Sequence, residues 1–476
     1  MRHLLSLIIC LLISNTSYSN SNQSSVKAEV DTKIRADMIV YGDYLVTMDG
    51  EIDVIHDGAV AIIGNNIAAV GLSIDIDQTY TSKNKIPGKD RILMPGLVNG
   101  HGHAAMVLFR GMADDLNLME WLTNYIFPME AQFVNPEFIK IGTELACWEM
   151  IRGGTTTYVD MYFYPETIAE TIVDCGMRAV IGSPSIDFPS PGFKGWEDSF
   201  AAAVEFVTRW KNKHERITPA FAPHAPYTVS PFHIKEVADK AKELDVPVSM
   251  HIAEDRTVVE DIQKRYGNSS VKHVADQGLL DVTLIAAHMV QPTAEEIAML
   301  SGKQVGVIHN PTSNLKLAAG IAPVAQMLKA GVLVGLGTDG AASNNDLDMW
   351  EELHLAALIH KNQNHDPTAM PAMTALKLAT SMGAAAIGLG DVTGSLEVGK
   401  RADMIQIDIA TPSLTPMYNV ISQLVYAVDS DDVVTSIVSG KALMRNGTVL
   451  TLDADEVRQK AVNKAKEISK ALTTQN

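Results

Sequence analysis

Short apolar runs alternate with stretches of helical periodicity through the middle of the chain, between residues 93 and 392. Eight runs have the character of buried strands: 97–98, 156–159, 179–181, 218–222, 246–250, 283–287, 304–308 and 332–336. The stretches that fit helices include 137–152, 165–175, 199–211, 231–244 and 293–301. Such alternation predicts parallel βα units, and eight units predict an α/β fold, a (β/α)8 TIM barrel. An open doubly wound sheet is the alternative.

Both ends of the chain show a different pattern of short strands separated by turn residues. Strand candidates lie at 38–41, 44–48, 59–63 and 67–70, with Gly42-Asp43 and Asp57-Gly58 as expected turns between and beside them. Similar strands return at 404–407, 433–438 and 448–452. Each end alone has few strands to close a core. We therefore expect one composite β-sandwich domain from residues 36–92 and 393–455, outside a barrel of residues 93–392, with a C-terminal helix at 456–476.

The first residues resemble an export signal. A weakly charged start at Arg2 and His3 precedes the apolar stretch 4–13, and the small residues Ser17 and Ser19 suit cleavage after residue 19. Residues 20–35 then read as a flexible, polar spacer. This pattern predicts a periplasmic or secreted protein, and the alternative is a misread start ahead of a cytoplasmic enzyme. The two cysteines left after cleavage do not make a disulfide framework, so we expect buried free thiols.

Composition narrows the classes of partner. Among the 476 residues, 46% are hydrophobic and 20% are charged, which is ordinary for a globular protein. No internal stretch is long and apolar enough to span a membrane. The formal net charge of −18 repels phosphate backbones, so a nucleic-acid partner is not expected. A small-molecule substrate is compatible with this charge, and a homodimer is left open.

Six of the 14 histidines stand at the C-terminal ends of predicted strands, the catalytic end of a barrel: His101, His103, His224, His251, His288 and His309. His101 and His103 are two residues apart on a strand, so both side chains point to the same face. His251 and Asp339 end two other strands, and the four groups predict one shared divalent metal. Imidazole and carboxylate ligands suit Zn²⁺, with Fe²⁺ as the alternative. The fourth strand carries no lysine that could bridge two metals, which favours a single ion.

Other polar groups at these strand ends suggest acid–base chemistry. Glu254 follows His251 by three residues and fits a general acid and base, although a helix-start carboxylate would look the same. His288 fits a group that orients or deprotonates the attacking water, or a hydrogen-bond partner of Asp339. His224 is expected to contact substrate, and His309 to be structural. The long segment 104–134, which includes Trp121, has the length of a lid or pocket wall.

Together these residues resemble the amidohydrolase superfamily, and within it the 5′-methylthioadenosine/S-adenosylhomocysteine deaminases and their triazine hydrolase and guanine deaminase relatives. The similar motifs lie at residues 94–101, 108–111, 120–122, 223–227, 287–288, 309–317 and 337–345. The likeness extends over about residues 36–455. It implies a barrel with a composite β domain, which agrees with the pattern above.

The resemblance also implies roles for single residues. His101, His103, His251 and Asp339 match the metal ligands, Glu254 the proton shuttle, and His288 the histidine beside the attacking water. Glu130 matches the position that holds ribose hydroxyls, and His224 matches a substrate-contact histidine. Trp121 is expected to form part of the pocket wall. Some members carry an arginine at the end of the third strand that pairs with the homocysteine carboxylate. Ser183 stands there in this chain, which favours 5′-methylthioadenosine or adenosine over S-adenosylhomocysteine.

The implied reaction is hydrolytic deamination of an aminopurine, with release of ammonia and an inosine-type product. In it, Asp339 and His288 accept or steer the proton of the metal-activated water, and Glu254 protonates the ring nitrogen and then the leaving amine. The alternatives are another N-heterocycle as substrate (guanine, a pterin or a triazine), a metal-free scaffold protein, or a periplasmic solute-binding protein that uses the same pocket.

Overall fold

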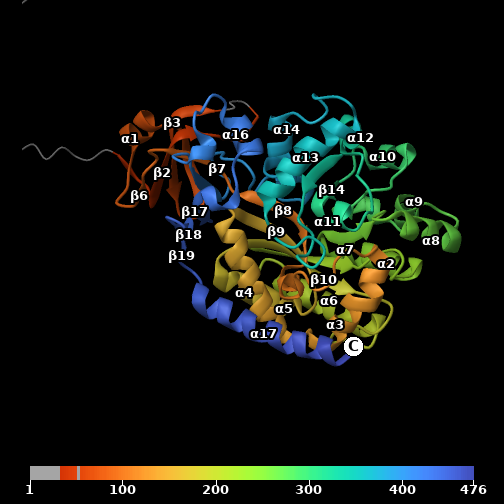
Figure 1. Cartoon of the computed structure of the whole chain (residues 1–476). Helices are drawn as coiled ribbons and strands as arrows, with labels where there is room; N and C mark the ends of the chain where they lie inside the picture. Colours follow the sequence, from red (N-terminus) through yellow and green to blue (C-terminus); the bar gives the residue numbers. More distant parts are fainter. Residues whose placement is uncertain (1–32, 51–53, 476) are drawn as a thin grey trace, which may run out of the picture.

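The structure is a computed structural model that describes residues 33–50 and 54–475. The expected export signal and most of the expected spacer lie outside these described residues. Within them, a barrel of strands and helices lies beside a β domain, to which N-terminal and C-terminal parts of the chain both contribute strands (Figure 1).

Eight parallel strands form the barrel sheet in unbroken chain order. They are β8 (Leu97–Gly102), β9 (Thr155–Met161), β10 (Arg178–Ser185), β11 (Ile217–Pro223), β12 (Val248–Ile252), β13 (Leu284–His288), β14 (Val305–His309) and β15 (Leu333–Leu336). The last strand, β15, lies against the first, β8, so the sheet nearly closes on itself. The predicted (β/α)8 barrel is therefore confirmed, and the open sheet is excluded. Figure 1 shows the helices outside these strands.

The larger helices of the barrel are α4 (Pro136–Arg152), α5 (Pro165–Cys175), α6 (Trp196–Trp210), α7 (Pro231–Leu244), α8 (Arg256–Tyr266), α10 (Ala294–Leu300) and α13 (Met349–Gln363). Their starts follow from local chemistry. The Asn135 side chain accepts a hydrogen bond from the Phe138 amide (3.0 Å), and Pro136 opens α4 without leaving an unpaired amide. Thr293 and Glu296 form a capping box at α10.

Shorter elements fill the connections: η1 (Ala104–Phe109), α2 (Leu118–Trp121), η2 (Leu122–Ile126), α3 (Phe127–Phe133), α9 (Ser270–Asp276), η3 (Leu279–Asp281), α11 (Pro311–Lys316), α12 (Val324–Lys329), α14 (Ala372–Leu378) and α15 (Ser381–Ala386). Segments α2, η2 and α3 occupy the long loop that follows β8. The last helix, α17 (Ala454–Gln475), runs along α4 (Figure 1), where Lys464 Nζ pairs with Glu137 Oε2 at 2.9 Å.

The β domain is one hydrogen-bonded sheet of nine strands drawn from both ends of the chain. The N-terminal part supplies β2 (Met38–Leu45), β3 (Ile55–Ile63), β4 (Asn66–Leu72), β6 (Lys85–Ile86) and β7 (Arg91–Pro95). The C-terminal part supplies β16 (Met404–Asp408), β17 (Val433–Val438), β18 (Lys441–Arg445) and β19 (Thr448–Val449). Antiparallel pairing of β7 with β16 joins the two parts. The composite β domain is thus confirmed, and the expected sandwich takes the form of one continuous sheet.

Two expected turns in this domain were wrong. Gly42-Asp43 and Asp57-Gly58 lie inside β2 and β3, and Gly42 is paired directly with Gly58. The glycines serve close packing instead. A Cβ at Gly58 would stand 2.4 Å from the Leu45 Cβ, and one at Gly42 would stand 2.9 Å from the Leu93 Cβ. Strands β7 and β18 were not expected, and the last predicted strand is shorter than 448–452.

Cys147 and Cys175 are buried and are not joined by a disulfide, as expected. Among residues 33–50 and 54–475, no helix has both the length and the apolar character needed to cross a membrane.

Candidate active site

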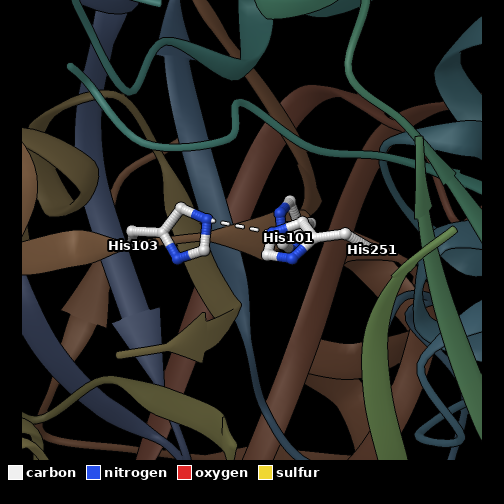
Figure 2. A group of neighbouring side chains, drawn as sticks. All are labelled: His101, His103 and His251. Atoms are coloured by element: carbon white, nitrogen blue, oxygen red, sulfur yellow. Dashed lines mark hydrogen bonds between the residues drawn. The ribbon is translucent and has the colours of Figure 1, made fainter. Parts of the chain in front are cut away.

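The side chains singled out in the sequence converge at the C-terminal ends of the barrel strands. His101 lies at the end of β8, and His103 follows that strand directly. His251 lies on β12, and Asp339 follows β15. Figure 2 shows the imidazoles of His101, His103 and His251 facing one another across the mouth of the barrel.

The nitrogen and oxygen atoms of these four residues are spaced like the ligands of one metal ion. Asp339 Oδ1 lies 3.4 Å from His101 Nε2 and 3.2 Å from His103 Nε2. His251 Nε2 lies 3.3 Å from His103 Nε2. Ligands at zinc distances of ~2.0–2.1 Å in a tetrahedral site stand about 3.3–3.4 Å from one another. His101 is fully buried, and neither of its ring nitrogens has a hydrogen-bond partner in the described structure. A divalent metal fits this donor set.

Hydrogen bonds outside the cluster set the orientation of two of the imidazoles. The Nδ1 atom of His103 donates to the Met161 carbonyl at 2.6 Å, and that of His251 donates to the His224 carbonyl at 2.8 Å. A neutral imidazole that donates through Nδ1 has its lone pair on Nε2. With a metal bound, both Nε2 atoms would present lone pairs to it, as ligation requires.

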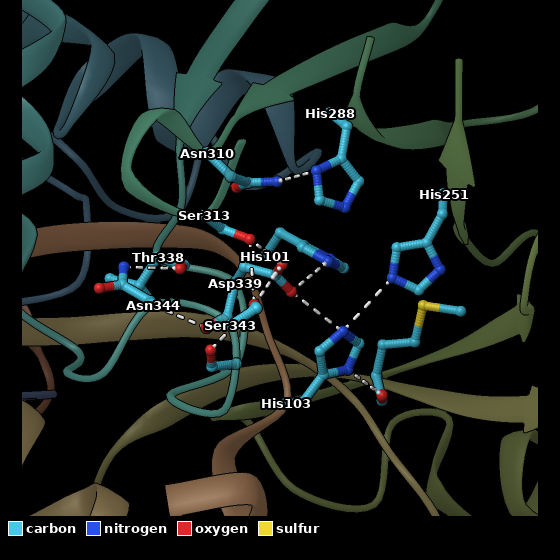
Figure 3. A network of polar contacts seen from close by, with 12 residues as sticks. His101, His103, His251, His288, Asn310, Ser313, Thr338, Asp339, Ser343 and Asn344 are labelled. Atoms are coloured by element: carbon cyan, nitrogen blue, oxygen red, sulfur yellow. Dashed lines mark hydrogen bonds and ion pairs between the residues drawn. The ribbon is translucent and has the colours of Figure 1, made fainter. Parts of the chain in front are cut away.

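Two serines support the other side of the Asp339 carboxylate. The hydroxyls of Ser313 and Ser343 both donate to Asp339 Oδ2, at 2.7 and 2.9 Å (Figure 3). Burial raises the pKa of this carboxyl, but the imidazoles of His101 and His103 outweigh that effect and hold the pKa well below its usual range. Asp339 is therefore an anion with one oxygen fixed by hydroxyls and the other facing the histidines.

His288 stands beside this cluster and is held by a different set of side chains. Its Nδ1 lies 2.8 Å from Asn314 Oδ1. The same atom lies 3.2 Å from Asn310 Nδ2 (Figure 3). The shorter contact is with an oxygen, which can only accept, so Nδ1 carries the proton. The other nitrogen, Nε2, has no hydrogen-bond partner in the described structure, although it lies 3.6 Å from Glu254 Oε1. A neutral His288 can therefore accept a proton at Nε2.

Glu254 is a buried carboxyl group on the same wall of the pocket. Burial raises its pKa, and the Asp339 carboxylate adds to that effect while His288 opposes it. A raised pKa keeps the proton on Glu254 at higher pH than usual, which suits a group that must donate it to a substrate.

One hollow at this end of the barrel has His103, His251 and Asp339 of the cluster in its lining. It encloses about 640 Å³ free of protein atoms, including its opening to solvent. Trp121, Glu130, His224, Glu254 and His288 all line it. No lysine or arginine is among its lining residues in the described structure.

Three of the lining groups are suited to hold a substrate. Trp121 Nε1 is buried without a hydrogen-bond partner among the described residues. The Nδ1 atom of His224 contacts Thr228 Oγ1 at 2.9 Å, and burial lowers the pKa of His224 to about 3. Burial raises the pKa of Glu130 to about 7, with Tyr162 beside it.

Two singled-out residues lie away from this hollow. Ser183 is buried on β10 and does not line the pocket, whereas its neighbour Pro184 does. His309 is fully buried against the ring of His360, with ring centroids 5.0 Å apart, and does not line the pocket either. That position agrees with the structural part expected for it.

Sequence reasoning missed the groups that hold the site in place: Ser313, Ser343, Asn310 and Asn314. The available signal was their position, because three of them follow His309 within five residues and Ser343 follows Asp339 within four. Residues close after a strand end lie near the strand-end ligands whatever their type.

A model of the amidohydrolase family matches residues 92–443, which cover the whole barrel and part of the β domain. The chain belongs to the amidohydrolase family. The family resemblance inferred from the motifs is thereby confirmed.

Similar sequences and structures agree with this assignment. A protein of Syntrophus aciditrophicus (strain SB), named 5-methylthioadenosine/S-adenosylhomocysteine deaminase 1, is 42% identical over 436 residues, or 92% of this chain and 98% of that protein. A deaminase of the same name from Syntrophobacter fumaroxidans (strain DSM 10017 / MPOB) is 43% identical over 426 residues, or 90% and 97% of the two chains. The crystal structure of an adenosine deaminase from Xanthomonas campestris with bound zinc superposes on this amidohydrolase with a TM-score of 0.90 at 38% identity, over 92% of this chain and all of that one (100%).

A more distant structure shares the fold alone. The zinc complex of an atrazine chlorohydrolase from Arthrobacter aurescens TC1 has a TM-score of 0.83 at 22% identity, over 90% of this chain and 100% of the other.

Proposed function

We propose that this amidohydrolase is a metal-dependent hydrolytic deaminase of an adenine nucleoside, with 5′-methylthioadenosine or adenosine as substrate. The observation that carries the proposal is the placement of Glu254, a carboxyl group of raised pKa, 3.6 Å from His288 at a metal-binding cluster. Deamination of an aminopurine needs that set: a site for the water, a base for its proton and an acid for the ring nitrogen. The names of the relatives at 38–43% identity support the nucleoside as substrate.

One divalent metal would be held by His101, His103, His251 and Asp339, with Zn²⁺ as our choice and Fe²⁺ as the alternative. When bound there, it supplies Lewis-acid chemistry that lowers the pKa of a coordinated water toward ~7. The zinc in the structurally similar adenosine deaminase supports this choice.

The chain's own residues then move the protons. His288 takes the proton of the attacking water at Nε2, with Asp339 steering the water. Glu254 donates its proton to the ring nitrogen next to the amino-bearing carbon, which makes that carbon electrophilic. Water oxygen adds to the carbon, and Glu254, now a carboxylate, takes the proton of the new C–O–H group and passes it to the amine. The C–N bond breaks, ammonia leaves, and the inosine-type product remains. The proton held by His288 then returns to Glu254, 3.6 Å away.

The pocket lining supports a nucleoside without a charged tail. In this proposal Glu130, Trp121 and His224, which line the pocket, contact the substrate: Glu130 accepts hydrogen bonds from the ribose hydroxyls, and the other two contact the base. The carboxylate of S-adenosylhomocysteine would find no lysine or arginine among the residues that line the described pocket. Leaving that carboxylate without a partner in a half-enclosed site is unfavourable, so we place this compound below the other two substrates.

The test is ammonia release by purified, zinc-loaded protein from 5′-methylthioadenosine, adenosine and S-adenosylhomocysteine in parallel, with guanine as control. We expect turnover of the first two and at least tenfold lower kcat/KM for the third. Turnover of guanine alone, with one metal per chain, would overturn the choice of substrate and leave the metal site standing.

The remaining assignments are proposals on the sequence pattern. Residues 1–19 would direct the protein to the periplasm or outside the cell. Residues 36–92 and 393–455 would form the composite β domain, and residues 93–392 the catalytic barrel. A homodimer is compatible with this proposal. Detection of the mature protein only in the cytoplasm would exclude export.

A further inference from the structure

A second hollow adjoins the active-site pocket and shares part of its wall. This side groove lies between α3 and the loop after β10, and encloses about 780 Å³ free of protein atoms, including its opening to solvent. Phe127, Glu130, Phe163 and Ile186 line both the pocket and the groove. The two hollows therefore adjoin at these residues, beside Glu130.

The groove presents an apolar and aromatic surface. Glu130 is the one charged residue among those that line it in the described structure, and it stands at the junction with the pocket. Away from that junction lie Phe188, which is 40% exposed, and a loop that includes Pro189 and Pro191. Phe188 contacts Phe127 edge to face, with ring centroids 6.1 Å apart. An exposed aromatic next to a substrate pocket is available to bind an apolar group.

We propose that the side groove binds an apolar substituent on the 5′ carbon of the nucleoside, so that the enzyme acts on adenosines with bulky 5′-alkylthio or 5′-arylthio groups. This inference rests on the proposed function, because it takes the ribose hydroxyls to lie at Glu130. The 5′ carbon is attached to the small ring that carries those hydroxyls, so it lies within a few ångströms of the junction. The opposite apolar wall, at Leu118, Leu122 and Ile126, is buried, whereas the groove opens to solvent and has room for a larger group.

The gain expected from the groove follows from the apolar surface that a substituent buries. Each CH₂ group transferred fully from water raises kcat/KM about fourfold, and a half-covered group about twofold. A 5′-butylthio group has three more CH₂ groups than a methylthio group. With half of their surface covered by the groove, kcat/KM rises about eightfold. A zwitterionic tail of similar length has no such gain, because the groove offers no cation to its carboxylate.

The experiment compares kcat/KM for adenosine, 5′-methylthioadenosine, 5′-butylthioadenosine and S-adenosylhomocysteine with the zinc-loaded full chain. Ala131 is exposed on α3 and lines the groove but not the pocket, so Ala131→Trp fills the groove and Ala131→Ser is its matched control. We expect the wild type and Ala131→Ser to favour the butylthio substrate over the methylthio substrate by about eightfold. Ala131→Trp should lose this preference and retain its activity on adenosine. A second variant, Phe188→Ala, removes groove surface without crowding and should reduce the preference to about two- to fourfold.

The outcomes separate this inference from the proposed function. Normal turnover of adenosine with no preference for the butylthio group in the wild type would overturn the groove as a binding site and leave the deaminase intact. An unchanged preference in both Ala131→Trp and Phe188→Ala would also overturn it. Absence of ammonia from every adenine nucleoside would overturn both proposals.

Discussion

Replacement of Ser313 by alanine tests how the chain holds its metal site. The Ser313 hydroxyl is fully buried and donates to Asp339 Oδ2 at 2.7 Å, while Oδ1 of the same carboxylate faces His101 and His103. A hydrogen bond to a charged group contributes about 1.5–3 kcal/mol, which corresponds to about 10- to 150-fold in an equilibrium constant. Supporting groups behind metal ligands have effects of about 10- to 100-fold. We therefore expect Ser313→Ala to weaken zinc binding about 10- to 100-fold.

The neighbouring serine makes the expectation sharper. The Ser343 hydroxyl also donates to Asp339 Oδ2, at 2.9 Å, and its Oγ lies 3.0 Å from Ser313 Oγ. One hydrogen bond to Oδ2 therefore remains when either Ser313 or Ser343 alone is replaced by alanine. Each hydroxyl has a single proton, so a hydroxyl that donates to Asp339 Oδ2 cannot also donate to the other serine. The double variant leaves Oδ2 without either bond, and its loss of affinity should exceed the product of the two single losses.

The assay is competition for zinc with a chromophoric chelator, with metal content measured after dialysis. Ser436→Ala is a matched control, because Ser436 is also buried and donates a 2.7 Å hydrogen bond, to the Ile151 carbonyl, but lies in the β domain. Both variants should lose similar stability in the metal-free state, and only Ser313→Ala should lose affinity for zinc. Equal zinc affinity in Ser313→Ala, Ser436→Ala and wild type would refute the assignment of Asp339 as a supported ligand.

Three further expectations follow from the site. Glu254→Gln should retain one metal per chain and lose at least about 100-fold in kcat, because the amide cannot donate and take back a proton; ammonia release and metal content measure this, and near-normal turnover would contradict the role. Asn314→Leu removes the acceptor for His288 Nδ1–H, so it should lower kcat about three- to tenfold with little change in KM. Asn314→Asp keeps an acceptor and should therefore recover part of the lost kcat. Burial raises the pKa of Glu352 to about 8. Between pH about 5 and about 8 the folded chain therefore keeps a proton on this carboxyl group that the unfolded chain has released. The free energy of unfolding should fall as the pH rises through that range. Denaturation across that range should show a flatter dependence in Glu352→Gln, and an equal slope would contradict the shift.

The barrel and its four candidate metal ligands were predictable from the sequence, because the topology of the barrel alone brings the ends of its strands, and the residues there, close together. Parallel strands of a barrel end at one mouth, so polar residues at strand ends converge even when they are far apart in the chain. His101 and Asp339 are 238 positions apart in the printed numbering and have side-chain atoms 3.4 Å apart. No knowledge of side-chain packing was needed for that step.

Predictions failed where side-chain packing decides the outcome. Gly42 and Gly58 have the composition of turns, yet they lie opposite each other inside a sheet because Leu45 and Leu93 occupy the space of their missing side chains. The supporting serines and asparagines have no periodicity of their own, since they lie in loops and in the short helix α11. Ser183 lies at the expected point of its strand and is buried, but its neighbour Pro184 lines the pocket and Ser183 does not.

Backbone conformation explains why the site needs so many supporting contacts. Ala253, His288, Met289 and Asp339 are not glycines, yet their φ angles are 51°, 75°, 48° and 62°. Left-handed conformations of this kind cost about 1–3 kcal/mol each and persist only where surrounding contacts determine them. The amide of Met289 donates to the Ile252 carbonyl (3.0 Å), and that of Asp339 donates to the His101 carbonyl (3.0 Å), so neighbouring strand ends hold each other in the strained conformation. Because His288 and Asp339 are also fastened through Asn314 and Ser313, the chain turns sharply at the strand ends and still presents His288 Nε2 and Asp339 Oδ1 to one point.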